Sequence, residues 1–189
     1  MKSTKAPKRL RSANALLVTN TAAGAATLTW VLASYLHKRK VSVVGAACGA
    51  VAGLVAITPA SGFVTAGGAV VIGLAVGGVC YSATLLRERL RVDDALDVFA
   101  VHGVGGTFGA IATGVLAVAA IGGVSGAIEG NVGQVATQLV AVVATAGFAA
   151  ASTFLIIKTI DLVLGMRVKP ADEELGLDLA LHGEAAYTT

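Results

Sequence analysis

The residue with the clearest capacity for chemistry in this chain is His102, which lies near the middle of a long apolar stretch. A stretch of this length is typical of a membrane span, where an ionisable side chain is costly and usually faces a cavity or a partner. Imidazole both donates and accepts hydrogen bonds and titrates near neutral pH. The residues that would share its face of an α-helix are small or apolar: Val98, Gly105, Gly106 and Gly109. The pattern favours passage of a small hydrogen-bonding molecule or a proton, and the alternative is a packing histidine bonded to a neighbouring carbonyl.

Three acidic residues precede His102: Asp93, Asp94 and Asp97. Carboxylates in the first turns of a helix interact favourably with the positive end of the helix dipole. We therefore expect Asp93 and Asp94 to cap the helix that carries the histidine. Asp97 lies deeper in the apolar stretch, and its position leaves both a structural and a functional role open.

The composition of the chain is that of a membrane protein. Of its 189 residues, 56% are hydrophobic, 13% are charged and 24 are glycine, and the mean hydropathy is +0.81. Average globular proteins are about 45–50% apolar and about 25% charged. These values exclude a disordered chain, a basic nucleic-acid-binding domain and an ordinary water-soluble enzyme. We expect a lipid bilayer as surroundings and no nucleic acid as partner.

Five apolar stretches have the length that a helix needs to cross a bilayer. They are continuous rather than alternating, which predicts helices and not a β-barrel. The sequence therefore predicts an all-α membrane protein, a bundle of about five transmembrane helices. The expected spans are residues 14–36, 41–64, 66–86, 96–119 and 132–164, within a membrane region of residues 13–165. In the second span, Thr58 and Pro59 are expected to end the regular helix early.

The basic residues gather at the ends of these spans. The loops after the first and third spans carry three each and the segment after the fifth adds Arg167 and Lys169, whereas the loops after the second and fourth carry none. The positive-inside rule then places the C-terminal tail, residues 166–189, in the cytoplasm. The five basic residues within residues 1–12 fall on the opposite side, which suggests that this segment is not the natural start of the membrane unit.

Glycines recur at four-residue spacing in three of the expected spans: Gly45, Gly49 and Gly53, then Gly73 and Gly77, then Gly105 and Gly109. Small residues at this spacing let helix backbones approach closely in lipid, where no hydrophobic force drives helices together. We therefore expect a tightly packed bundle.

The other residues with chemical potential give weaker signals. Cys48 and Cys80 lie among Gly, Ala and Val and are expected to be small packing residues. His37 and His182 lie at a basic loop and in the tail, and we expect both to be solvated. The sequence contains no zinc-ligand spacing, Walker motif or Ser-His-Asp arrangement. We expect no metal, no cofactor and no enzymatic activity.

Three segments together resemble the ammonium transporter family (Amt/Mep, related to Rh proteins). The most distinctive is VDDALDVFAVHGVGG at residues 92–106, and the others are GAACGAVAGLVAITPA at residues 45–60 and GLDLALHGEAAY at residues 176–187. Their order and spacing match those of the family, and the similarity extends from about residue 13 to residue 187.

The resemblance implies a fold and a set of roles. Members of the family generally have eleven spans and form trimers with a pore in each subunit, and the five spans here resemble the seventh to the eleventh. His102 matches the second of two pore histidines, Val98 a pore-lining position, and Asp97 a mainly structural acid of the same motif. The tail resembles the region that couples subunits and helps to bind PII-type regulatory proteins. The resemblance also implies a multi-pass protein of the plasma membrane, with a cytoplasmic C-terminus.

The main hypothesis is therefore a truncated or partial ammonium transporter whose task is to move ammonium or ammonia. The first six spans of the family, with the first pore histidine and the outer recruitment site, have no counterpart in the chain, and residues 1–12 do not resemble the family. The alternative is a non-transporting membrane module, or a remnant, that at most assembles with full-length transporters or regulates them. A haem or metal centre is a remote option, since a lone histidine in the membrane offers one ligand.

Overall fold

The computed structural model describes residues 7–185, and what the sequence predicts for residues 1–6 and 186–189, including Lys2, Lys5 and Tyr187, lies outside the described residues. The elements are α1 (Lys8–Lys38), α2 (Val43–Ile57), α3 (Ala66–Leu90), the π-helix η1 (Phe99–Val104), α4 (Gly105–Leu116), α5 (Ala119–Gly122), the 3₁₀ turn η2 (Ala127–Glu129), α6 (Gly133–Leu164), α7 (Pro170–Leu175) and the π-helix η3 (Asp178–His182). The chain forms two compact units, residues 1–143 and 144–189.

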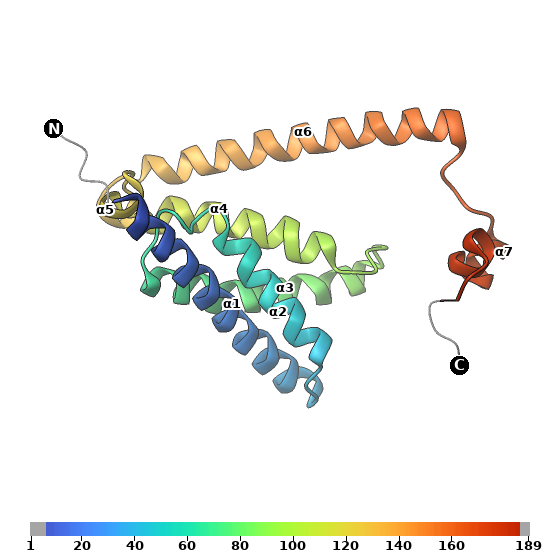
Figure 1. Ribbon diagram of the computed structural model, residues 1–189, viewed down its shortest axis with the longest axis horizontal. Helices are drawn as coiled ribbons and strands as arrows, with labels where there is room; N and C mark the ends of the chain where they lie inside the picture. Colours follow the sequence, from blue (N-terminus) through green and yellow to red (C-terminus); the bar gives the residue numbers. More distant parts are fainter. Residues whose placement is uncertain (1–6, 186–189) are drawn as a thin grey trace. The chain divides into compact units, whose positions relative to one another are not determined.

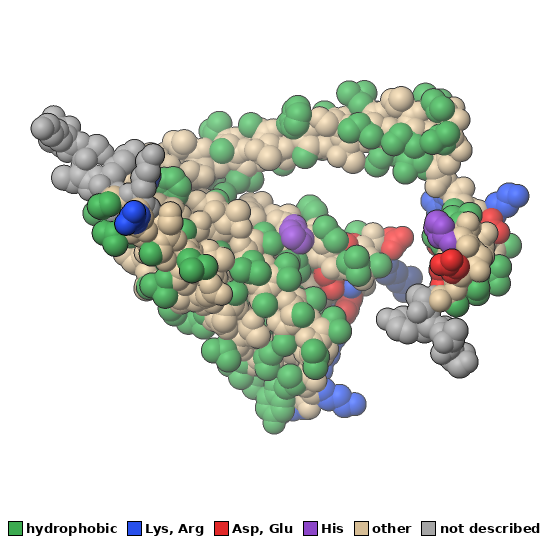
Figure 2. All heavy atoms as spheres, viewed as in Figure 1, with side chains coloured by type: hydrophobic (Ala, Val, Ile, Leu, Met, Phe, Trp, Pro, Cys, Tyr) green, Lys and Arg blue, Asp and Glu red, His purple; other side chains and the backbone are tan. Residues whose placement is uncertain are grey.

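In the first unit, α1 packs against both α2 and α3, and α4 with η1 packs against the same two helices (Figure 1). The buried core between them consists mainly of small side chains. Its members include Val18, Ala22, Ala26 and Trp30 of α1, Ala52, Ala56 and Ile57 of α2, and Ala69, Ile72, Val76 and Cys80 of α3. Many larger aliphatic side chains lie on the outside, and hydrophobic side chains are scattered over the visible face (Figure 2).

The sequence accounts for the ends of the long helices. Ser42 and Thr65 precede α2 and α3, and each side-chain oxygen accepts the backbone N–H three residues on, as N-caps do. Arg39 and Arg91 follow α1 and α3 in left-handed conformation and close both helices with C-cap hydrogen bonds. The basic clusters thus coincide with helix C-termini, where positive charge is favourable.

The helix in the second expected span is shorter than residues 41–64, since α2 ends at Ile57 and turns follow to Phe63. Pro59 cannot continue a helix, and the Thr58 hydroxyl donates back to the Leu54 carbonyl at 2.7 Å. At 1.5 Å per residue, the 15 residues of α2 are about 22 Å long, less than the roughly 30 Å of bilayer hydrocarbon.

Four helical segments among the described residues are long and apolar enough to cross a membrane: Arg9–Lys38, Ala66–Leu90, Phe99–Leu116 and Gly133–Leu164. The third of these differs from the single helix expected over residues 96–119. It begins after Asp97, starts with π-helical turns, and gives way to extended backbone at Ala117. The left-handed conformation of Asp97, with φ of 54°, keeps that residue out of the helix.

The predicted glycine stripes lie at helix contacts, as expected. A methyl group at Gly53 would lie 2.5 Å from the Ala22 carbonyl oxygen, and one at Gly73 would lie 2.5 Å from the same atom. One at Gly77 would lie 2.5 Å from the Ala26 carbonyl oxygen. Two neighbouring helices therefore approach the backbone of α1 more closely than any side chain allows.

In the second unit, α7 and η3 follow the end of α6. Gly165, Gly176 and Gly183 have positive φ angles at the breaks between elements. Pro170 starts α7 at the first helical position, where its missing N–H has no cost, and the acidic residues Asp172 and Glu173 occupy the first turn.

We expect Gly73→Ala to lower the free energy of unfolding by about 1–3 kcal/mol, the usual cost of forcing a methyl group into a packed core. The matched control is Gly24→Ala on the exposed face of α1, where the new methyl group would meet no atom within 4 Å. This control should be neutral or slightly stabilising because alanine is the better helix former. The free energy of unfolding of both variants is measured from the loss of helical circular dichroism as the dodecyl sulfate concentration is raised. Equal costs would contradict the close packing of α1 and α3.

Candidate functional site

His102 lies on the π-helical element η1 and directly follows two buried residues. Ala100 and Val101 are 2% and 4% exposed, whereas His102 is exposed and Val98 is 51% exposed. The Gly105 N–H donates to the His102 carbonyl rather than to the carbonyl four residues back. Single π-turns within helices are rare and frequent at functional sites. The imidazole is therefore presented on the outer side of a segment whose inner side is buried.

The expectation that Val98, Gly105, Gly106 and Gly109 all share a face with His102 is wrong for Gly105 and Gly109. Both are buried, and a methyl group at Gly105 would touch Cys80 of α3 and Val55 of α2. The residues of one helical ridge are spaced by four, and adjacent ridges face different directions. Val98, His102 and Gly106 form one ridge, which is exposed or half-buried, and Gly105 and Gly109 belong to the next.

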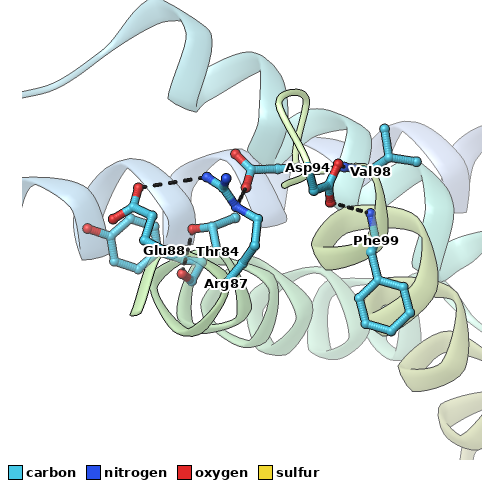
Figure 3. Close-up of polar contacts among 8 residues, drawn as sticks. Thr84, Arg87, Glu88, Asp94, Val98 and Phe99 are labelled. Atoms are coloured by element: carbon cyan, nitrogen blue, oxygen red, sulfur yellow. Dashed lines mark hydrogen bonds and ion pairs between the residues drawn. The ribbon is translucent and has the colours of Figure 1, made fainter. Parts of the chain in front are cut away.

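The start of this segment is capped by Asp94. Its carboxylate accepts the Val98 N–H at 2.9 Å and the Phe99 N–H at 2.8 Å (Figure 3). These are two of the backbone donors that a helix N-terminus leaves without an internal partner. The capping role expected for Asp94 is confirmed.

Asp97 forms an ion pair with Arg87 of α3. The Asp97 Oδ1 lies 2.8 Å from the Arg87 Nε, and each side chain is 24% exposed. Figure 3 shows Arg87 reaching from α3 toward the segment that leads into η1. Glu88, at 4.0 Å from the Arg87 guanidinium and 53% exposed, is a weaker neighbour. The pair ties the entrance of η1 to the end of α3.

Sequence reasoning named Asp97 but missed its partner. Arg87 belongs to a basic cluster that the charge pattern assigned to a loop, whereas the structure places it within the last turn of α3. The sequence did contain a signal for this pair, because Arg87 and Asp97 have opposite charges and are only ten residues apart. Only the left-handed turns at Arg91 and Asp97 bring the two side chains together.

A second polar contact was also missed. His37 is exposed, as expected of a residue at a basic loop, yet its Nδ1 lies 2.9 Å from the hydroxyl oxygen of Tyr81. Tyr81 is 8% exposed and meets Trp30 edge to face, with ring centroids 5.6 Å apart. This contact joins the end of α1 to α3 and lies on different helices from His102.

Metal binding has no support in the geometry of the described residues. Over residues 7–185, no three His, Cys, Asp or Glu side chains gather as a metal site would require. The chemistry available around His102 is therefore that of one imidazole among apolar groups, which can hydrogen bond to a small molecule or hold a proton.

Comparison with known proteins identifies the family. The sequence model of the Ammonium Transporter Family matches residues 2–187. The chain belongs to the ammonium transporter family. This confirms the resemblance carried by the three motifs, and with the four apolar helices it makes the chain a multi-pass membrane protein.

Individual family members are similar over nearly the whole chain. The ammonium transporter Amt1 of Archaeoglobus fulgidus is 43% identical over 175 residues, which cover 93% of this chain and 44% of that protein. The ammonium transporter of Bacillus subtilis is 44% identical over 176 residues, covering 92% and 44%. The crystal structure of Candida albicans Mep2 matches with a TM-score of 0.81 and 36% identity, over 90% of this chain and 40% of that one. The chain thus spans less than half the length of these relatives, and its all-α membrane fold is that of the family.

We expect the Arg87–Asp97 pair to contribute a coupling free energy of about 1–3 kcal/mol, because removing one partner of a half-buried pair leaves the other charge uncompensated. A double-mutant cycle with Arg87→Gln and Asp97→Asn measures it through the free energy of unfolding. Asn suits this position because it tolerates the left-handed conformation. Glu88→Gln is the control and should change stability by less than about 0.5 kcal/mol, as exposed pairs do. Additive single costs would contradict the ion pair.

Proposed function

We propose that this chain contributes a pore wall for ammonium or ammonia transport across the plasma membrane. The observation that carries the proposal is the exposed imidazole of His102 on an otherwise apolar ridge with Val98. Membership of the ammonium transporter family supports the substrate, because the relatives in the comparison are named for it.

The proposed mechanism uses the imidazole as a hydrogen-bonding group within an apolar lining. Ammonium transfers a proton to an imidazole nitrogen of His102, neutral ammonia passes along the lining, and the imidazole returns the proton to ammonia on the inner side. A bare ammonium ion is costly in such surroundings, whereas ammonia is neutral and can exchange hydrogen bonds with imidazole nitrogens. His102 would hold the hydrogen bond or the proton, and Val98 would keep water from the passage.

The small and structural residues of the motif have supporting roles in this proposal. Gly106 adds no side chain to the ridge of His102, while Gly105 and Gly109 allow α4 to pack close to α2 and α3. Asp97 holds the entrance through Arg87. None of these residues is proposed to contact the substrate.

The expected orientation and partners belong to the same proposal. Basic residues at the ends of α1 and α3 support a cytoplasmic C-terminus. A pore wall needs helices opposite it, so the chain would act as part of a trimer or together with other transporter subunits. The tail would then be available to a PII-type regulatory protein.

We expect His102→Ala to lower the uptake of labelled methylammonium by at least about tenfold, since positioned proton-transfer groups contribute about that much or more. The assay uses cells that lack other ammonium transporters and express the full chain. Thr107→Ala is the matched control, because Thr107 is an exposed polar residue on α4, which directly follows η1, and should leave uptake unchanged. Uptake that is insensitive to His102→Ala would remove the pore role of this residue.

A non-transporting module is the second candidate, favoured by the exposure of His102 and Val98 on one ridge, which leaves that ridge free to pack against helices of a full-length transporter. In this case the chain assembles with full-length transporters and alters their regulation. Affinity purification of the tagged chain from a membrane that also contains a full-length family transporter tests it. An unrelated multi-pass protein in the same membrane is the control. Recovery of the transporter alone would support the module, and recovery of neither would contradict it.

A further inference from the structure

Cys80 is buried where α3 meets the segment that carries His102. Its side chain is 0% exposed, and the proposed transport mechanism does not use it. Its thiol sulfur lies 3.9 Å from the Val101 carbonyl oxygen, within reach of a thiol hydrogen bond. Val101 directly precedes His102, so the contact acts on the backbone next to the imidazole.

The Val101 carbonyl is the group that the π-turn leaves without its usual α-helical donor. In an α-helix this carbonyl would accept the Gly105 N–H, four residues ahead. In this structure the Gly105 N–H donates to the His102 carbonyl. Val101 is 4% exposed, so water has little access to its carbonyl, and donors within the protein must satisfy it. The Cys80 thiol supplies a donor at this position.

Gly105 fits the same arrangement from the other side. A methyl group at Gly105 would lie 3.1 Å from the Cys80 sulfur, closer than ordinary contacts. The sulfur therefore occupies the space between the Val101 carbonyl and the Gly105 backbone. A smaller side chain at residue 80 would leave this space empty, and a larger one would press on α4.

We infer that Cys80 is a positioning residue, whose thiol donates to the Val101 carbonyl and holds the π-helical turn that presents His102. The functional value of this position rests on the proposed pathway role of His102, but the contact can be tested without it. A thiol is a weak donor, so the role combines a modest hydrogen bond with the fit of the sulfur against Gly105.

The hydrogen bond is tested in the chain with Cys48→Ala, which leaves Cys80 as the only thiol, because the sequence contains two cysteines. We expect the infrared S–H stretching band of this variant to lie at lower frequency than that of a thiol dissolved in an alkane. A band at the alkane position would overturn the donor role. This measurement leaves residue 80 unchanged and therefore does not depend on how a core substitution folds.

The positioning role is tested with Cys80→Ala and Cys80→Ser, which differ by one hydroxyl donor. Histidine-labelled chain in detergent gives one imidazole resonance for each histidine, and the His102 resonance is identified by its loss in His102→Ala. We expect Cys80→Ala to shift this resonance and Cys80→Ser to return it toward the parent position, with His182, which lies in the tail, unmoved in both. Equal shifts in the two variants, or no shift, would overturn the positioning role.

Methylammonium uptake then separates this inference from the proposed function. We expect uptake to fall by about two- to fivefold in Cys80→Ala relative to Cys80→Ser, as loss of one modest hydrogen bond implies. If His102→Ala leaves uptake unchanged, the pathway role fails, while rescue of the His102 resonance by serine still supports the positioning role. If His102→Ala abolishes uptake and serine rescues neither the resonance nor uptake, the positioning role fails and the pathway role stands.

Discussion

The close approach of α1 to both α2 and α3 is the constraint on which the rest of the first unit depends. Gly53 and Gly73 meet the Ala22 carbonyl from two sides, and Gly77 meets the Ala26 carbonyl one turn later. Lipid gives helices no hydrophobic reason to associate, so contact between surfaces this close must supply the attraction. Because the facing groups are backbone atoms, no rotamer change can make space for an added side chain. The distances of α2 and α3 from α1 therefore depend on glycines, which place no side chain at these contacts.

This three-helix platform positions the helix that carries His102. Gly109 approaches the Ala56 backbone of α2, and Gly105 fits against the sulfur of Cys80 on α3. The same α3 supplies Arg87, whose ion pair holds Asp97 at the entrance. The backbone that carries His102 is thus held by contacts on the inner side of its segment, while the imidazole points to the outer, exposed side. A side chain that binds a passing molecule needs this arrangement, because its hydrogen-bonding atoms must not already be used within the protein.

The π-turn at η1 links the packing to the proposed chemistry. His102 lies in this turn and is exposed, while Gly105 directly after it is buried against α2 and α3. The Gly105 N–H donates to the His102 carbonyl, and the Cys80 thiol of the neighbouring helix lies 3.9 Å from the Val101 carbonyl. In the inference drawn above, the position of the imidazole depends on this one small side chain of α3. Family membership explains why such a motif occurs, and the contacts explain how it is held.

The sequence by itself determined the membrane character, the helical class, the family and the identity of His102, because hydropathy, glycine spacing and local motifs are properties of neighbouring residues. It also predicted the break at Pro59 and the cap at Asp94, which depend on backbone chemistry within a few residues. Tertiary structure alone decided the partner of Asp97, the contact of His37 with Tyr81 and the place of Cys80 beside Val101. Each of these joins different elements, and their geometry follows from left-handed turns, a π-turn and helix crossings that no local pattern encodes. The sequence therefore identified the imidazole of His102 as a candidate group, and only the packing of the helices showed which contacts hold its segment in place.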